Sequence, residues 1–246
     1  MSNSAGLGDT PEVAYHLTTP LTVRTYEVLS LALFLGGCVY VWRSKNPVYV
    51  GIYLASSIGG GIFEWIFDSK YYFRLTADNR FISAWTMAGE KAPAAMILIY
   101  GFFFGIPLVL LRQYKAVLYQ RAGNTGIYCL IFSLGFFGTP AFECTNTTVT
   151  KIYKYHQRDE YLFYGMPYSN FWFGVLMMGL PYWGLEQAEA LTTLIPRTML
   201  SRSRQKLLAA SVGFSTVITA FFIAATLNGI WYATAGDIWT ETPRAF

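Results

Sequence analysis

Two glutamates within long apolar stretches are the residues of this chain best placed to do chemistry. Glu64 lies in Gly-Gly-Gly-Ile-Phe-Glu-Trp-Ile-Phe-Asp, about one turn before the expected end of a helix, and Asp68 follows four residues later on the same face. Glu143 lies in Gly-Thr-Pro-Ala-Phe-Glu-Cys, near the expected end of another helix. Neighbouring glycines and a proline leave room there for a second backbone or a ligand. We therefore predict that Glu64, Glu143 and Asp68 are catalytic carboxyl groups around a shared pocket.

Carboxyl groups in such surroundings are expensive to insert into a membrane. A charged carboxylate at the centre of a membrane helix costs about 2.5–3.5 kcal/mol, so these residues usually face the interior of a bundle or a wet cavity. A protonated carboxyl group among apolar side chains is suited to proton donation. The alternative is that they end their helices at the membrane surface and pair there with Lys or Arg. We favour that alternative for Glu27 and Asp237, which lie at polar boundaries of the chain.

Aromatic residues are concentrated around both glutamates. Aromatic faces stabilise cations, including the carbocation formed when an acid protonates an alkene or an epoxide. An ordinary aromatic belt at the membrane surface is the alternative explanation for any single ring. The rings that we predict to bind substrate are Trp65, Tyr71, Tyr72, Tyr153, Tyr155 and Trp172.

The composition indicates the elements that must position these residues. The chain has 246 residues, of which 54% are hydrophobic and only 13% are charged, about half the charged fraction of a typical soluble domain. Crossing a bilayer takes about 20 apolar residues in a helix. The stretches without any Asp, Glu, Lys or Arg are 46–63, 92–111, 122–142, 161–185 and 207–236. They predict an integral, multi-pass helical membrane protein.

We predict an all-α membrane helix bundle with six, or at most seven, transmembrane helices. A polar N-terminal tail (1–22) precedes a single transmembrane domain (23–236), and a polar C-terminal tail (237–246) follows it. A two-hairpin internal repeat is also expected, because each glutamate is followed by an aromatic loop and a proline-containing return helix. Residues 186–200 could add an interfacial helix. The expected helices cover about 23–42, 47–67, 92–111, 125–143, 168–184 and 207–235.

Charge distribution orients the bundle. The short connections 43–46, 112–123 and 197–206 are basic, and short basic loops remain on the cytoplasmic side. Both termini are therefore expected on the non-cytoplasmic side. The expected partners are the lipid bilayer and an apolar small molecule. A nucleic acid is not expected, because the positive charges do not form one clustered face.

Several kinds of chemistry are not expected. The two histidines, His16 and His156, lie outside the predicted helices and cannot form a multi-histidine iron site. No HExxH, Walker A, GxSxG or DDxxD sequence occurs, so we expect neither a metal nor another cofactor. Asn146-Thr-Thr148 matches the acceptor sequence for N-glycosylation.

Two families share parts of this pattern. Glu143 followed by Thr148, Tyr153-Lys-Tyr155, Gly165-Met-Pro167 and a proline-containing helix resembles the integral-membrane carotenoid hydratases. Glu64, flanked by Phe63 and Trp65, is similar to the acid of the small membrane-bound terpene cyclases of fungal meroterpenoid pathways. The resemblance covers about a third of the chain. It implies acid-initiated protonation of an isoprenoid without a metal, with Glu64 and Glu143 as the acids.

The sequence therefore predicts a metal-free enzyme that cyclises or hydrates an isoprenoid lipid. Two alternatives remain open. The same carboxyl groups could bind or transport a small apolar molecule or a proton without converting it. The chain could also be a structural subunit whose aromatic and glycine-rich faces pack against other membrane proteins.

Overall fold

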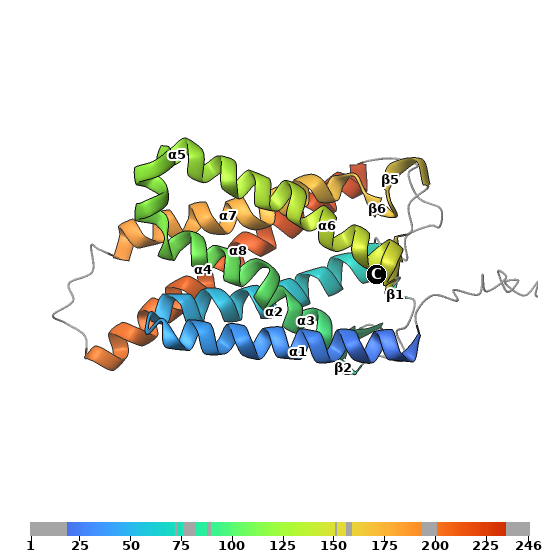
Figure 1. Cartoon of the computed structure of the whole chain (residues 1–246), viewed down its shortest axis with the longest axis horizontal. Helices are drawn as coiled ribbons and strands as arrows, with labels where there is room; N and C mark the ends of the chain where they lie inside the picture. The colour runs from blue at the N-terminus through green and yellow to red at the C-terminus, as the bar shows by residue number, and fades with distance from the viewer. Residues whose placement is uncertain are drawn as a thin grey trace, which may run out of the picture.

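The computed structural model describes residues 19–71, 73–75, 82–87, 90–150, 152–155, 159–192 and 201–234. In this part of the chain, six helical rods lie roughly along one axis (Figure 1). The first two are α1 (Pro20–Arg43) and α2 (Pro47–Tyr71). The last two are α7 (Ser169–Thr192) and α8 (Arg202–Thr234).

The two middle rods alternate between α- and π-helix. One consists of α3 (Ala94–Tyr100), the π-helical segment η1 (Gly101–Gly105) and α4 (Ile106–Gln113). The other consists of α5 (Lys115–Ser133), the π-helical segment η2 (Leu134–Gly138), α6 (Thr139–Cys144) and the π-helical segment η3 (Thr145–Val149).

Prolines explain where two of these π-helical segments occur. Pro107 and Pro140 each follow the end of a π-helical segment by two residues. A proline inside a helix has no N–H to donate, and its ring collides with the carbonyl group four residues earlier. Widening the preceding turn relieves that collision. The structure accordingly places a π-helical turn before Pro107 and another before Pro140.

Polar residues define both the start of α1 and the turn that joins α1 to α2. Thr19 caps the start of α1 by accepting a hydrogen bond from the Thr22 N–H at 3.1 Å. After α1, Lys45 adopts a positive φ of 55°, and Asn46 Oδ1 accepts from the Val48 N–H at 3.0 Å. Pro47, the first residue of α2, needs no donor there.

Short strands close one end of the bundle. In the described residues, β1 (Phe73–Leu75) pairs with β4 (Tyr153–Tyr155), and β2 (Ser83–Met87) pairs with β3 (Glu90–Pro93). A short 3₁₀ turn, η4 (Asp159–Tyr161), then leads into β5 (Leu162–Phe163), which pairs with β6 (Met166–Pro167). The all-α prediction misses these strands, because each is too short to show a recognisable alternation of polar and apolar residues.

Glycines allow the helices to approach closely. A Cβ atom at Gly51 of α2 would lie 2.0 Å from the carbonyl oxygen of Ala210 in α8. A Cβ atom at Gly135 of η2 would lie 2.5 Å from the carbonyl oxygen of Gly174 in α7. Small residues at such crossings are typical of membrane helix bundles. The largest fully buried side chains include Tyr53, Tyr182 and Phe221.

The described residues include four helices long and apolar enough to cross a membrane: Pro20–Arg43, Ala94–Gln113, Lys115–Val149 and Arg202–Trp231. Their outward faces expose large apolar side chains, as a lipid-facing surface requires. On α1 these are Val28, Leu31, Leu35, Val39 and Trp42. The findings agree with an integral membrane protein that crosses the bilayer more than once.

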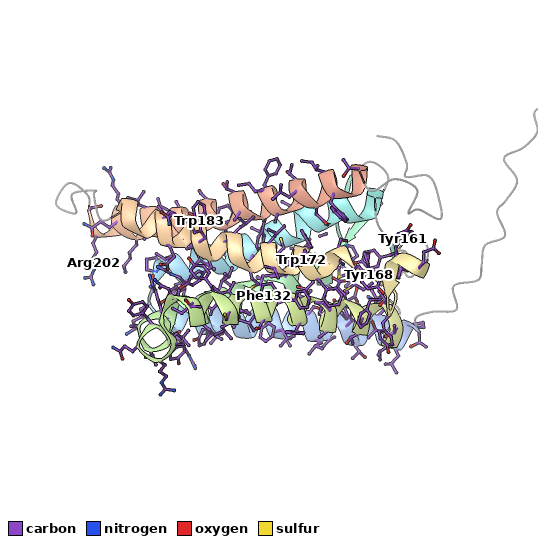
Figure 2. All side chains as sticks on the ribbon, turned by 90° about the horizontal axis from the view of Figure 1, so that it is seen from above. Phe132, Tyr161, Tyr168, Trp172, Trp183 and Arg202 are labelled. Carbon is purple, nitrogen blue, oxygen red and sulfur yellow. The ribbon has the colours of Figure 1, made fainter. Side chains whose placement is uncertain are left out.

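Both ends of the bundle carry exposed aromatic rings. Tyr161, Tyr168 and Trp172 lie toward the strand-bearing end, whereas Trp183 lies toward the end where Arg202 begins α8 (Figure 2). The start of α1 lies at the strand-bearing end, and the turns α1–α2 and α4–α5 lie at the opposite end (Figure 1). We call that opposite end, with Arg43, Lys45, Arg112, Lys115 and Arg121, the basic end.

An ion cluster ties three helices together at the basic end. Glu186 of α7 pairs with both Arg112 at the end of α4 and Lys115 at the start of α5. The sequence places Glu186 in a connection, but α7 continues through it to Thr192. Residues 193–200, which complete the interfacial helix considered above, lie outside the described residues.

Candidate acid site

Glu143 lies in the last turn of α6 and is 4% exposed. Thr139 precedes it by four residues and Asn146 follows it by three, which places all three side chains on one face of the helix. Thr139 and Asn146 are also buried. Three polar side chains therefore lie on one buried face of this helix, and this face is the candidate site.

Two elements from other parts of the chain supply partners for the Glu143 carboxyl group. Tyr155, in β4, donates its hydroxyl hydrogen to Glu143 Oε2 at 2.8 Å. Asn170, in the first turn of α7, donates from Nδ2 to the Tyr155 hydroxyl oxygen at 2.9 Å. Tyr155 and Asn170 are both buried. Asn170 therefore holds the Tyr155 hydroxyl group with its hydrogen directed at the Glu143 carboxyl group.

Two other polar atoms on the same face are buried without a hydrogen-bond partner among the described residues. They are Thr139 Oγ1 and Asn146 Nδ2. Such atoms are rare in folded proteins and need an explanation such as a functional role, a bound water or an ion. Asn146 of the glycosylation sequence is only 2% exposed, so the packing of the folded chain leaves no room for an attached glycan.

A small cavity adjoins the carboxyl group. Its lining consists of Ile99, Tyr100, Phe103, Phe104, Thr139, Phe142, Glu143 and Phe173. The space open to the centre of a water-sized sphere is about 10 Å³, which is enough for about one water molecule. Five of the eight lining residues carry aromatic rings. The arrangement therefore places a carboxyl group and a hydroxyl group beside aromatic faces, away from bulk solvent.

Aromatic packing closes this cavity. The rings of Phe103, from η1, and Phe142, from α6, have centroids 4.6 Å apart. Phe104 stacks on Tyr100 at 5.4 Å and meets Phe221 of α8 edge-on at 5.8 Å. Phe103 and Phe104 belong to η1, and Phe142 belongs to α6, which follows η2. A change in either π-helical segment would therefore alter the size of the cavity.

For the predicted partner acids, Glu64 and Asp68, the structure describes the backbone and not the side chains. Glu64, Trp65, Asp68 and Tyr71 belong to α2, but their side chains lie outside the described residues, as does the whole of Tyr72. Phe73 in β1 pairs with Tyr155 in β4, so the chain leaving α2 runs beside the strand that carries a partner of Glu143. The shared pocket of Glu64 and Glu143 stays a prediction.

Of the predicted substrate-binding rings, Tyr155 contacts Glu143 and Trp172 does not line the cavity. Tyr155 contacts Glu143, although it is absent from the cavity lining. Tyr153 pairs with Leu75 in the sheet, and its side chain lies outside the described residues. Trp172 is exposed on α7, packs edge-on against Phe132 and Phe136 and is not among the residues that line the cavity.

Two polar residues that the sequence analysis does not select belong to the same site, since Thr139 lines the cavity and Asn170 donates to Tyr155. Asn170 and Thr139 are polar residues within the charge-free stretches 161–185 and 122–142. Their polarity within these apolar stretches could have identified them, because a buried polar side chain in a membrane helix needs a partner. Tyr100, Phe103 and Phe104 could not be selected, because aromatic residues are common throughout the chain.

Glu27 agrees with its interpretation as a boundary residue. It pairs with Arg24 three residues earlier on α1, and its Oε1 accepts a hydrogen bond from the Ile82 N–H at 2.6 Å. This carboxylate therefore anchors the segment before β2 to the start of α1. Asp237 lies outside the described residues.

Comparisons of the chain with protein-family models, with curated proteins and with solved structures find no match. The function must therefore be argued from the acid site itself.

Proposed function

We propose that this chain is a membrane enzyme that protonates a carbon–carbon double bond or an epoxide of an isoprenoid lipid, with Glu143 as the acid. The observation that carries the proposal is the buried Glu143 carboxyl group beside a cavity lined with aromatic rings. The faint resemblance to isoprenoid hydratases and cyclases supports the same chemistry.

The contacts suggest how protonation would proceed. The electron pair of the alkene forms a carbon–hydrogen bond with the Glu143 proton, which leaves a cation on the more substituted carbon. The faces of Phe103, Phe104 and Phe142 stabilise that cation. The Tyr155 hydroxyl group, held by Asn170, donates to the new carboxylate and stabilises its charge.

Two outcomes can complete the reaction. Attack by a second double bond of the substrate forms a ring, and loss of a proton to a carboxylate then gives the neutral product. Addition of water instead gives an alcohol and returns a proton to a carboxylate. Glu64 is the proposed partner base, because the chain that follows it pairs with the strand carrying Tyr155.

An isoprenoid requires far more room than the observed cavity of about 10 Å³. Binding therefore requires the Phe103 and Phe142 rings to separate. The small volume also favours a second candidate function, in which the site binds or transports a proton and converts no lipid.

The proposed arrangement in the membrane has six spans, with α2 and α7 crossing beside the four helices identified above. The basic end faces the cytoplasm, because its short connections carry the positive charges. The strand-bearing end and both termini then face the opposite side. Within this arrangement Glu143 is nearer to the non-cytoplasmic surface. The proposed internal repeat would place β1 and β4, which pair with each other, in its two aromatic loops.

A comparison of lipid extracts tests the enzyme proposal. Isoprenoid-producing cells would express the wild type, Glu143→Gln or Glu160→Gln at matched membrane levels. Glu160 is an exposed carboxylate in η4 and serves as the control. We expect mass spectrometry to show an isomer or water adduct with the wild type and Glu160→Gln, and at least about a hundredfold less with Glu143→Gln. Identical extracts from all three cultures would contradict the proposal and favour binding without conversion.

A further inference from the structure

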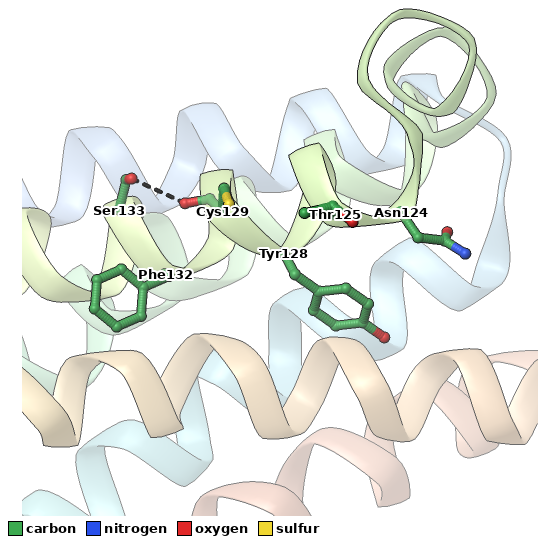
Figure 3. A pocket seen from close by; sticks show the side chains of 6 residues that line it. All are labelled: Asn124, Thr125, Tyr128, Cys129, Phe132 and Ser133. Carbon is green, nitrogen blue, oxygen red and sulfur yellow. Dashed lines mark hydrogen bonds between the residues drawn. The ribbon is translucent and has the colours of Figure 1, made fainter.

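A second hollow lies on the outer surface of the bundle, away from Glu143. It is an open groove of about 580 Å³ along α5, lined by Asn124, Thr125, Tyr128, Cys129, Phe132 and Ser133. Tyr128 and Phe132 point from α5 toward the neighbouring ribbon of α7 (Figure 3). The Tyr128 ring lies edge-on to Tyr182 of α7 at 6.0 Å, and Phe132 lies edge-on to Trp172 at 6.1 Å.

The face of α7 beside this groove carries one glycine between two tryptophans. Trp172, Gly179 and Trp183 are separated by seven and four residues and therefore share one face of the helix. A Cβ atom at Gly179 would meet nothing within 4 Å, whereas both tryptophans are exposed. Gly179 thus leaves an open space between two large rings, next to the helix that carries Tyr128 and Phe132.

Polarity changes along the groove. Asn124 and Thr125 lie just after the sharp bend at Gly123, where φ is 63° and ψ is −173°. Before that bend, residues 115–122 run across the basic end of the bundle (Figure 1). Farther along α5, the Ser133 hydroxyl group donates to the Cys129 carbonyl oxygen at 2.8 Å (Figure 3), which leaves the Cys129–Phe132 half effectively apolar.

Charge near the polar end is positive. Arg121 is exposed and precedes Asn124 by three residues. Glu186, the acidic side chain described at this end, is already paired with Arg112 and Lys115. A ligand that carries a negative charge at one end and a hydrocarbon chain at the other would complement both halves of the groove.

We propose that this groove binds one anionic phospholipid from the leaflet at the basic end. The headgroup phosphate lies by Arg121 and Asn124, and the Tyr128 hydroxyl group faces the ester region. One acyl chain lies between α5 and α7 in the space that Gly179 leaves open. Lipid bound in this way would hold α5 against α7, the helix that supplies Asn170 to the acid site.

Native mass spectrometry of the delipidated, detergent-solubilised full chain tests this site. Phosphatidylglycerol and phosphatidylcholine with identical acyl chains would be added in turn. Gly179→Leu places a side chain in this open space, since a Cβ atom there meets nothing within 4 Å. Gly36→Leu is the matched control, because Gly36 lies on α1 and its added Cβ also meets nothing within 4 Å. Arg121→Gln removes the proposed headgroup charge.

We expect the wild type and Gly36→Leu to retain one phosphatidylglycerol in preference to phosphatidylcholine. Gly179→Leu should weaken retention of phosphatidylglycerol about tenfold, and Arg121→Gln should abolish the preference between the two headgroups. Equal retention of both lipids by the wild type, or unchanged retention by Gly179→Leu, would overturn the proposal. Copurification of a protein partner that displaces the lipid from the wild type would also overturn it.

Discussion

At the scale of single residues, Glu143 is held by a chain of two hydrogen bonds whose members come from distant parts of the sequence. Tyr155 and Asn170 follow Glu143 by 12 and 27 positions, and they belong to a strand and to another helix. The sequence could identify Glu143 because it is an acid in an apolar stretch. It could not identify the hydrogen bonds, since they depend on where β4 and α7 pack.

Tyr155→Phe tests this chain of hydrogen bonds. The change removes one hydroxyl group and leaves the buried Glu143 Oε2 without this donor and Asn170 Nδ2 without this acceptor. A buried polar group that loses its partner costs about 1–3 kcal/mol, so we expect a lower thermal unfolding midpoint in detergent, measured by circular dichroism. Tyr164→Phe is the control, because Tyr164 is 70% exposed. Equal midpoints for both variants would show that the Tyr155 hydroxyl group does not stabilise the fold.

At the scale of elements, glycine positions set how closely the helices pack. The contact between η2 and α7 joins Gly135 and Gly174, and Thr139 lies against the same spot, since a Cβ atom at Gly174 would lie 2.3 Å from Thr139 Oγ1. This contact brings the start of α7, with Asn170, to the face that carries Glu143. The sequence predicts the helices and the general role of glycine at crossings, but it does not reveal which glycines meet.

Gly174→Ala should therefore destabilise the bundle. The new methyl group would lie 2.3 Å from the Gly135 carbonyl oxygen, a backbone atom that can move only if the helices separate. Overpacking of this kind costs about 1–3 kcal/mol. Gly179→Ala, on the same helix, adds a methyl group into open space and should be neutral or slightly stabilising. Denaturant unfolding in detergent would compare the two, and equal stabilities would contradict this account of the crossing.

At the scale of the whole molecule, hydrophobicity and charge predict most of the architecture. The helical rods overlap the ranges expected from the charge-free stretches, because a membrane helix needs only length and apolar composition. The fourth rod begins ten residues earlier than expected, at Lys115, and α7 ends eight residues later, at Thr192. The strands, the π-helical segments and the bend at Gly123 escape prediction. They depend on local backbone geometry, which short aromatic sequences do not specify.

The proposed orientation can be tested with single cysteines in a cysteine-free background. Lys45→Cys lies at the basic end and Glu160→Cys at the strand-bearing end, and both positions are exposed. In intact cells we expect a membrane-impermeant maleimide to label the cysteine at position 160 and not the one at position 45. Permeabilised cells should allow both to be labelled. The reverse pattern in intact cells would invert the bundle in the membrane.

The pairing of β1 with β4 has a consequence for biosynthesis. Phe73 faces Tyr155, so the two strands cannot meet until the ribosome has made the chain through α3, η1, α4, α5, η2, α6 and η3. The first two helices can enter the membrane well before then, but Tyr155 cannot be aligned with its partner strand until the fourth rod is complete. The acid site is thus one of the last parts of the protein to mature. A translational pause or truncation before position 155 would leave inserted helices with Glu143 not yet paired with Tyr155 or Asn170.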